Sequence, residues 1–385
     1  MSELEKENLT CIATTLPGLE AVLCHELQSL GAADVRAGRQ AVRFSADRAL
    51  LYRANLELRT SLRLLQVIAE FPAADIAALY RRARELSWER YLTPQMTLAV
   101  RAAGAAPQGD DPRYVALKLK DAVVDRLRSR FGRRPSVDAG NPDLQINLYW
   151  DRNGAVLSRD SSGESLHRRG YRSEHTEAPL SEVLAAGMVL LSGWDRRSTF
   201  YNPMCGSGTI AIEAALAGCG IAPGLLRRRF GFQRWLDYDA QLWHGLQSEA
   251  LQRARDSAAA AAPVIAADVD PEAVRIALRN LERTGFRDLV RLMRRDFLSG
   301  NPPPSAGDAP VLVINPPYGK RLEEPEIEQL YSRIGDRLKN AYAGWTAWII
   351  SGNRGALKRI GLRDGKRIAL FNGPIECSYR AYSLY

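Results

Sequence analysis

The part of the sequence with the most specific chemistry is a short proline-rich turn that follows an apolar run. The run Val311–Ile314 leads into Asn315, Pro316, Pro317 and Tyr318. Two prolines fix the backbone and withhold N–H donors, so the turn is rigid. Such a turn can direct the Asn315 side-chain oxygen and the Pro316 carbonyl at one amine while Tyr318 stacks on a planar ring. We therefore predict that these four residues form the catalytic site and hold a substrate NH₂ group.

A glycine-containing loop is the second candidate, and it is expected to bind a ligand through its backbone. Glycines let the backbone approach a ligand closely, and the first N–H groups of the helix that follows can bind an anion. The third glycine of the dinucleotide fingerprint and the Lys-Ser/Thr pair of a phosphate-binding loop are missing, which disfavours both nucleotide interpretations. The loop residues predicted to bind a cofactor are Asn202, Pro203, Met204, Cys205, Gly206, Gly208 and Thr209.

Two carboxylates follow later predicted strands and are typical of contacts to an adenosine moiety. Asp268, next to Val269, is placed to accept hydrogen bonds from both ribose hydroxyls. Asp270 stands directly before a predicted helix and is better explained as its N-cap. Asp296, next to Phe297, can accept from the adenine amino group. We predict that Asp268, Val269, Asp296 and Phe297 contact the cofactor.

All these candidates fall in the second half of the chain, where predicted strands and helices alternate. This alternation is typical of a parallel sheet with right-handed crossovers, whose strands end at one common edge. The predicted strands span residues 198–202, 263–269, 289–293, 311–315, 346–351, 366–371 and 378–385. The predicted helices span residues 209–217, 271–284 and 325–341.

The first half of the chain reads as two smaller α+β units without a catalytic constellation. The first unit has predicted strands at 9–14 and 41–44 and predicted helices at 18–30 and 46–58. The second unit has predicted strands at 96–103, 144–150 and 155–160 and a predicted helix at 114–131. We expect these units to support or bind a partner, because they lack candidate catalytic residues.

Taken in order, these motifs resemble those of class I S-adenosylmethionine-dependent methyltransferases that act on exocyclic or amide nitrogens. Further segments are similar to the THUMP-containing RNA guanine-N2 methyltransferases, in particular the large-subunit ribosomal RNA enzymes of Gram-negative bacteria. These segments are 120–123, 134–135, 160–163, 166–172, 177–182 and 221–225. The resemblance covers essentially the whole chain.

The resemblance implies an α/β fold in which a Rossmann-like class I methyltransferase sheet follows ferredoxin-like and THUMP α+β domains. The implied divisions are a ferredoxin-like unit at 1–60, a THUMP domain at 61–165, a linker at 166–185 and the methyltransferase domain at 186–385. It also implies S-adenosylmethionine as cofactor, with Pro179 and Leu180 among its contacts. The implied reaction is methyl transfer to the exocyclic N2 of a guanine in 23S ribosomal RNA. The target base must be flipped out or single-stranded to reach the site.

Two features depart from the family pattern. Asn202 stands where the family usually has Asp; its oxygen can still accept from the methionine ammonium, but without a charge, so we expect lower cofactor affinity. Many relatives carry a further fused methyltransferase domain, whereas this chain ends at Tyr385, so one active site is expected.

Several basic residues are predicted to contact RNA, although each has a structural alternative. Arginines in the segment 227–235 are interleaved with Phe230, Phe232 and Trp235, a pattern that suits phosphate contact plus base stacking. Alternatively the aromatic side chains pack onto the domain and only the arginines meet solvent. The arginines in 168–172 form either an RNA-facing hinge or a salt-bridged linker. The predicted RNA-binding residues are Lys118, Lys120, Arg168, Arg169, Arg172, Arg227, Arg228 and Arg229.

Composition narrows the class of protein further. A formal charge of +9, from 53 basic and 44 acidic residues, favours a polyanionic partner. We find no run long enough to span a membrane and no secretory signal, so we expect a cytoplasmic protein.

The cysteines and histidines lack metal-ligand spacing, and no metal is expected. Covalent catalysis by Cys205 is disfavoured because no base partner stands near it in the sequence. The sequence leaves the oligomeric state open, with a monomer preferred.

Rival functions remain open at this point. The Asn315 turn recognises an amine but does not distinguish the group that carries it. The same turn is therefore expected in an adenine-N6 or cytosine-N4 DNA methyltransferase, a protein glutamine methyltransferase and a tRNA methyltransferase. A non-catalytic ribosome-assembly factor that keeps the cofactor pocket is a further alternative. The THUMP-like half favours an RNA substrate.

Overall fold

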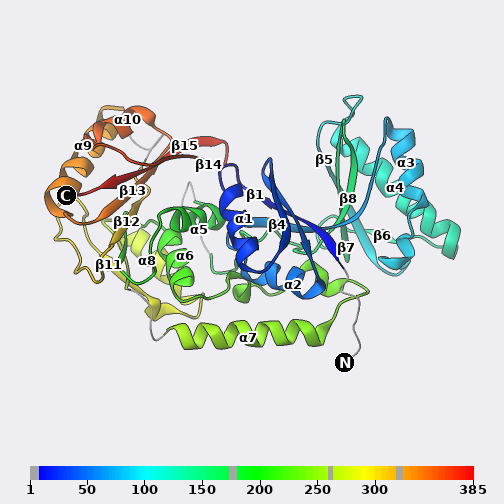
Figure 1. Cartoon of the computed structure of the whole chain (residues 1–385), viewed down its shortest axis with the longest axis horizontal. Coiled ribbons are helices and arrows are strands. Elements are labelled where there is room, and N and C mark those ends of the chain that lie inside the picture. Colours follow the sequence, from blue (N-terminus) through cyan, green and yellow to red (C-terminus); the bar gives the residue numbers. More distant parts are fainter. Residues whose placement is uncertain (1–7, 173–179, 259–262, 318–323) are drawn as a thin grey trace.

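The computed structural model describes residues 8–172, 180–258, 263–317 and 324–385. They form two bodies side by side, each built on one sheet, with helix α7 (Ala240–Ala258) running beneath both (Figure 1). The N-terminal sheet has eight strands in the order β2-β3-β1-β4-β8-β7-β5-β6. The C-terminal sheet has seven strands in the order β11-β10-β9-β12-β13-β15-β14.

The N-terminal sheet is continuous across both predicted α+β units. Strand β4 pairs antiparallel with β1 on one side and with β8 on the other, so it joins the two units. The strands are β1 Leu9–Thr15, β2 Ala33–Gly38, β3 Ala41–Ala46, β4 Ser61–Phe71, β5 Thr97–Ala103, β6 Ser136–Val137, β7 Leu144–Asp151 and β8 Gly154–Asp160. The sequence analysis did not place β2, β4 or β6. Most of β2 is exposed, so no apolar alternation marks it.

Four helices cover the N-terminal sheet, and three of them begin at an Asp whose side chain caps the first turn. Asp47, Asp75 and Asp111 accept from backbone N–H groups at the starts of α2, α3 and α4. The helices are α1 Glu20–Ser29, α2 Arg48–Glu57, α3 Ile76–Glu85 and α4 Pro112–Phe131. Helix α3, which the sequence analysis also left out, packs against α4 and buries Leu79 and Ala83.

The C-terminal sheet is parallel from β11 through β13, and β15 and β14 complete it as an antiparallel hairpin. Its strands are β9 Phe200–Pro203, β10 Val264–Asp268, β11 Val290–Arg294, β12 Val311–Ile314, β13 Thr346–Ser351, β14 Arg367–Asn372 and β15 Ile375–Ser383. Its helices are α5 Glu182–Leu191, α6 Thr209–Gly218, α8 Pro271–Glu282, α9 Glu324–Ala341 and α10 Arg354–Arg359. The predicted α/β architecture is confirmed, with strand positions within a few residues of those expected.

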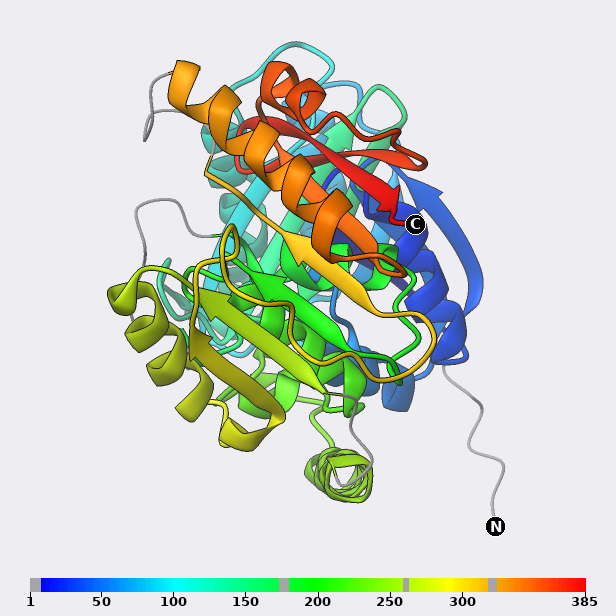
Figure 2. The same ribbon diagram turned by 90° about the vertical axis from the view of Figure 1, so that its left-hand side faces the viewer.

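Two hydrophobic layers enclose this sheet. Phe200 and Val313 pack in one layer with α5, α6 and α8, while Tyr201 and Leu312 pack in the other with α9 and α10. Side chains of a strand alternate between faces, so a strand covered on both sides is apolar at every position. In Figure 2 helix α9 crosses one face of the sheet, and helix α7 is seen end-on below it.

An insert between α6 and β10 joins the two bodies. Helix α7, Ala240–Ala258, lies against α2 of the N-terminal body. Phe230, Phe232 and Trp243 are buried in the N-terminal core, where the Phe232 ring stacks on Tyr52 at 4.1 Å between centroids. Trp235 is buried as well, under the Arg159 guanidinium, 3.7 Å from its ring centroid. The alternative in which these aromatic side chains pack rather than stack on bases is therefore confirmed.

Among the described residues, no helix combines the length and the apolar character needed to cross a membrane.

Candidate active site

Four strand ends bring the predicted site residues to one edge of the C-terminal sheet. Strand β9 lies between β10 and β12, and β11 follows β10, all of them parallel. The chain order therefore reverses at β9, which makes the crevice beyond β9 and β12 the topological switch point where open α/β sheets bind ligands. Asp268 is the last residue of β10, and the glycine loop, Asp296 and Asn315 follow the ends of β9, β11 and β12.

The glycine loop after β9 has a backbone shaped for close approach. Met204, Gly206 and Gly208 have φ of 58°, 53° and 80°. These values lie in the left-handed region of the backbone, which residues other than glycine rarely adopt. A Cβ atom added at Gly206 would meet nothing within 4 Å, so this backbone lies open. Gly208 is the N-cap of α6 and provides no side-chain cap, so the first N–H groups of the helix stay available to a ligand.

Asp268 holds this loop from the neighbouring strand. Its Oδ2 accepts from the Gly206 N–H at 2.8 Å, and its Oδ1 accepts from the Asp270 N–H at 3.0 Å. Asp270 in turn caps α8 by accepting from the Glu272 N–H at 2.9 Å, which confirms its predicted role as a cap. Val269 is 58% exposed beside the loop, an apolar surface at the edge where an adenosine moiety is expected.

Asp296 and Phe297 follow β11 and differ in their exposure. The Asp296 carboxylate accepts from the Leu298 N–H at 2.9 Å and the Ser299 hydroxyl at 2.8 Å, forming a turn at the strand end. Phe297 is buried, and its ring packs against Tyr342 at 5.5 Å between centroids. Its ring therefore supports the turn from the core in this structure.

The Asn315 turn leaves a buried acceptor without a partner. Strand β12 ends at Ile314, and the Asn315 Oδ1 atom is buried without a hydrogen-bond partner within the described ranges. Buried carbonyl oxygens normally accept a hydrogen bond, so one that does not is a candidate ligand contact. Pro316 is buried and Pro317 half-buried, whereas the predicted Tyr318 and Pro179 lie outside the described residues.

Asn202 lies deep between the loop and this turn. It is fully buried, and its Nδ2 donates to the Val313 carbonyl at 2.9 Å. Its Oδ1 has no hydrogen-bond partner in the part of the chain that the structure describes.

The site offers no activated nucleophile in Cys205. Burial raises the pKa of its thiol well above the ordinary value, and the nearby Asp268 charge acts in the same direction. A thiol with a raised pKa stays protonated and is a poor nucleophile. The structure thus agrees with the exclusion of covalent catalysis by Cys205.

Two residues that the sequence analysis did not assign to the loop hold it in place. Asn280 of α8 donates to the Ser207 carbonyl at 3.0 Å. Arg172, predicted to bind RNA, instead donates to the Thr209 hydroxyl at 2.9 Å and the Leu180 carbonyl at 2.6 Å, and pairs with Glu182 at 3.7 Å. Neither contact has a signal in the sequence, because both depend on how the helices pack.

Two other predicted RNA-binding arginines, the buried Arg169 and the half-buried Arg227, are committed to contacts within the protein. The Arg169 side chain is 1% exposed, pairs with the buried Glu213 at 3.6 Å and donates to the Leu166 carbonyl at 2.6 Å. Arg227 donates to four backbone carbonyls between residues 162 and 168. Burial and the nearby Arg169 charge lower the pKa of Arg227 to about 10. These arginines join the two bodies, so the salt-bridged alternative describes Arg169 and Arg172, and Arg227 ties the insert to the linker.

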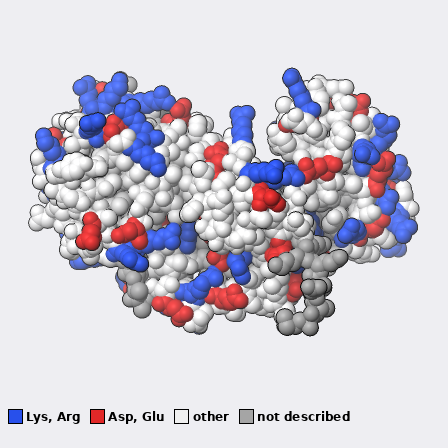
Figure 3. All heavy atoms as spheres, in the orientation of Figure 1, with Lys and Arg blue, Asp and Glu red and all other residues white. Residues whose placement is uncertain are grey.

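Other predicted RNA contacts do face solvent. The Arg168 side chain is 67% exposed, Arg228 is exposed, and the exposed Arg229 donates to the Asn141 Oδ1 at 2.6 Å. Space-filling atoms show Lys and Arg, interspersed with acidic residues, over α3 and α4 at one end of the molecule (Figure 3).

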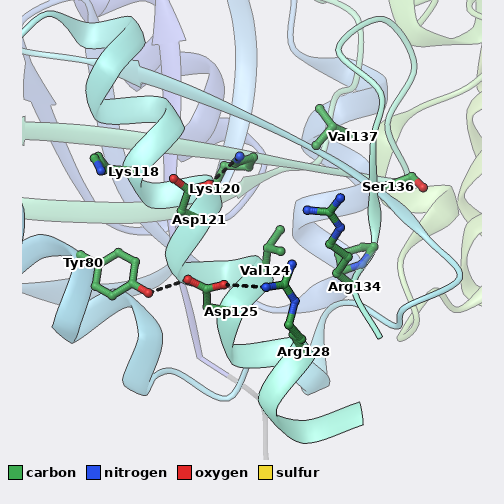
Figure 4. A pocket seen from close by; sticks show the side chains of 11 residues that line it. Tyr80, Lys118, Lys120, Asp121, Val124, Asp125, Arg128, Arg134, Ser136 and Val137 are labelled. Carbon is green, nitrogen blue, oxygen red and sulfur yellow. Dashed lines mark hydrogen bonds and ion pairs between the residues drawn. The ribbon is translucent and has the colours of Figure 1, made fainter. Parts of the chain in front are cut away.

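Lys118 and Lys120 line a hollow of about 850 Å³ between α4 and the strand β6 (Figure 4). Four basic and two acidic side chains contribute to it, and Lys120 pairs with Asp121 at 2.5 Å. The Asp125 carboxylate accepts from the Tyr80 hydroxyl at 2.6 Å. The lining residues are Tyr80, Lys118, Lys120, Asp121, Val124, Asp125, Arg128, Arg134, Pro135, Ser136 and Val137.

Comparison with known proteins assigns each part of the chain to a family model. Residues 169–381 match the RMKL-like methyltransferase domain. Residues 10–65 match the RlmL ferredoxin-like domain, and residues 73–160 match the THUMP domain. The expected fold class and the expected order of domains are thus confirmed.

Related proteins cover the chain from end to end. A putative RNA methyltransferase, slr0064 of Synechocystis, is 41% identical over 97% of this chain and 96% of its own length. The ribosomal RNA large subunit methyltransferase K/L of Pseudomonas aeruginosa is 40% identical over 98% of this chain, which spans only 52% of that relative. A solved structure titled SMU.472, a putative methyltransferase complexed with SAH, has a TM-score of 0.88 and 30% identity, covering 99% of both chains. The chain therefore belongs to the RMKL-like methyltransferase family.

Proposed function

We propose that this protein uses S-adenosylmethionine to methylate the exocyclic N2 of a guanine in large-subunit ribosomal RNA. The observation that carries the proposal is the unpartnered, buried Oδ1 of Asn315 at the switch-point edge of a methyltransferase sheet. The THUMP domain and relatives named as ribosomal RNA methyltransferases support an RNA substrate.

The residues at the sheet edge fit the cofactor of this family. The open backbone at Gly206 and the uncapped start of α6 suit the methionine portion, whose carboxylate would accept from backbone N–H groups. The Asp268 carboxylate would accept from the ribose hydroxyls beside the exposed Val269, and Asp296 from the adenine amino group. When bound, S-adenosylmethionine supplies an electrophilic methyl group on its sulfonium.

The Asn315 turn would orient the amine that receives this methyl group. The guanine N2 is nearly uncharged, and its lone pair is delocalised into the ring, so orientation and polarisation matter more than a strong base. Asn315 Oδ1 and the Pro316 carbonyl would accept the two amine hydrogens, which directs the nitrogen lone pair away from them. Tyr318 remains the predicted stacking partner of the base.

Basic residues away from the sheet edge would hold the RNA outside the site. Lys118 and Lys120 in the THUMP hollow, with Arg168, Arg228 and Arg229 near the linker, are the candidates for phosphate contact. Arginine and lysine contacts to phosphate supply affinity without reading the base sequence.

A substrate comparison tests the proposal. Purified protein is incubated with labelled S-adenosylmethionine and, in parallel, with large-subunit ribosomal RNA, ribosome-assembly intermediates, tRNA and DNA. We expect label in ribosomal RNA and N2-methylguanosine in its nucleoside digest by mass spectrometry, and no label with Asn315→Ala. DNA is included because a neighbour with 29% identity and a TM-score of 0.87 is titled a predicted N6-adenine-specific DNA methylase. Label in N6-methyladenine, or equal label with the variant, would contradict the proposal.

A further inference from the structure

The backbone pairing between β9 and β12 is short at the site. It covers two residue pairs, Phe200 with Val311 and Tyr201 with Leu312. One residue further on, the Asn202 side chain takes over, because its Nδ2 donates to the Val313 carbonyl at 2.9 Å. A side chain thus continues the connection between the strands at the point where they separate around the switch-point crevice.

This contact requires a hydrogen-bond donor on the side chain at position 202. A backbone carbonyl can only accept a hydrogen bond, so the atom facing Val313 must be the NH₂ of Asn202. An ionised carboxylate at this position has no donor and would direct its charge at the negative end of the carbonyl dipole. Asn202 is therefore more than an uncharged substitute for an Asp.

We propose that Asn202 is a positioning residue that ties the end of β9 to β12 and so sets the spacing between the cofactor loop and the Asn315 turn. Met204, where the loop begins its left-handed course, lies two residues after Asn202, and Asn315 lies two residues after Val313. The inference rests on the proposed function of this edge as the methyl-transfer site. Asn202 acts through the two segments that it joins.

The competing explanation gives the opposite prediction for one substitution. If position 202 served only to accept from the methionine ammonium, Asn202→Asp would add a favourable charge and tighten cofactor binding. If the Nδ2 donation matters, the same substitution weakens binding. The effect then depends on pH, because burial raises the pKa of the introduced carboxyl and the protonated form can still donate to Val313.

Other ionisable groups lie on the elements around this position and must be controlled for. Asp268 ends β10 and accepts from the Gly206 N–H of the cofactor loop, and burial raises the pKa of Cys205 in the same loop. Glu182 of α5 and Glu213 of α6 lie in the same hydrophobic layer, paired with Arg172 and Arg169. Wild type and variant share all of these groups, so the ratio of their affinities at each pH isolates the introduced carboxyl.

The experiment measures binding of S-adenosylhomocysteine by calorimetry between pH 5.5 and 7.5. We expect Asn202→Asp to bind about tenfold or more weakly than wild type at pH 7.5 and to approach wild type at pH 5.5. Asn202→Ala should bind weakly at both pH values. Equal or tighter binding by Asn202→Asp at pH 7.5 would overturn the proposal.

A matched control separates the crosslink from the general cost of a buried carboxyl. Asn55 is 1% exposed in the N-terminal body, and its Nδ2 also donates to a carbonyl, that of Leu51 at 2.9 Å. Asn55→Asp should lower stability as pH rises while leaving S-adenosylhomocysteine affinity unchanged. A pH-dependent loss of affinity in this control as large as in Asn202→Asp would also refute the proposal.

Hydrogen exchange of ligand-free protein keeps the inference testable even if the proposed function fails. The peptide covering residues 311–315 should exchange faster at pH 7.5 in Asn202→Asp and Asn202→Ala than in wild type, and Asn55→Asp should leave it unchanged. Unchanged exchange in both Asn202 variants would overturn the crosslink whatever substrate the protein acts on. Failure of the proposed function would instead appear as absence of methyl transfer to RNA.

Discussion

The carboxyl edge of the C-terminal sheet and the arginine-rich surface between the two bodies differ in what fixes their side chains. At the edge, each candidate residue lies at or just after the end of a parallel strand, so the sheet itself brings Asp268, Asp296 and Asn315 to one edge. Between the bodies, adjacent arginines have unlike surroundings: the side chain of Arg168 is 67% exposed and that of Arg169 1%. Sheet topology therefore predicts where a site lies. Packing between the two bodies decides whether an arginine side chain is exposed and can bind a partner, or is buried and stabilises the fold.

The largest effect on the free energy of unfolding should come from removing the buried arginine of the Arg169–Glu213 ion pair. Arg169→Ala leaves Glu213 buried without its cation, and breaking a buried ion pair in this way costs about 3 to 5 kcal/mol. Urea unfolding should show this loss, while the neighbouring Arg168→Ala changes the free energy of unfolding by less than about 0.5 kcal/mol. Similar losses for both variants would erase the distinction between the two arginines.

Removing the amine acceptor at the sheet edge should abolish activity without unfolding the protein. For Asn315→Ala we expect kcat to fall about 100- to 1,000-fold, the range seen when one group that polarises the reacting atoms is removed. S-adenosylhomocysteine affinity and the thermal midpoint serve as controls and should stay near wild type. A variant that keeps its turnover would remove Asn315 from the catalytic site.

Asp268 tests the cofactor half of the same edge. Asp268→Ala removes the acceptor for the Gly206 N–H and the proposed ribose contact, and S-adenosylhomocysteine should bind about 10- to 100-fold more weakly. Asp270→Ala is the matched control, since it removes a helix cap worth about 1 kcal/mol of stability and should leave affinity nearly unchanged. Calorimetry distinguishes the two, and equal affinity losses would contradict separate roles.

The smallest effect concerns the insert. Replacing Arg228 and Arg229 by Ala should reduce the slope of log affinity for RNA against log salt by about one unit for each phosphate that the protein no longer neutralises. Arg227→Ala should leave the slope unchanged and lower stability, because its guanidinium is committed to backbone carbonyls. If Arg227→Ala alone reduced the slope of log RNA affinity against log salt, Arg227 would contact RNA phosphate after all.

The sequence predicts the sheet edge well because apolar runs that end in polar residues mark the ends of buried strands. Strand β12 and the Asn315 turn were therefore predictable, as was Asp270 as a cap. Exposed strand β2 and helix α7 have no comparable pattern, and helix α7 gains its partner only from the other body. The contacts of Arg172 and Arg227 escaped prediction for the same reason, since residue type shows charge but not burial.

Strand β4 makes the two N-terminal units inseparable by simple truncation. Deleting the first 60 residues would strip away β1 and leave one side of β4 without its ladder of backbone partners. The unpaired backbone groups of an exposed strand edge can pair with a strand of another chain, so such a shortened protein should self-associate.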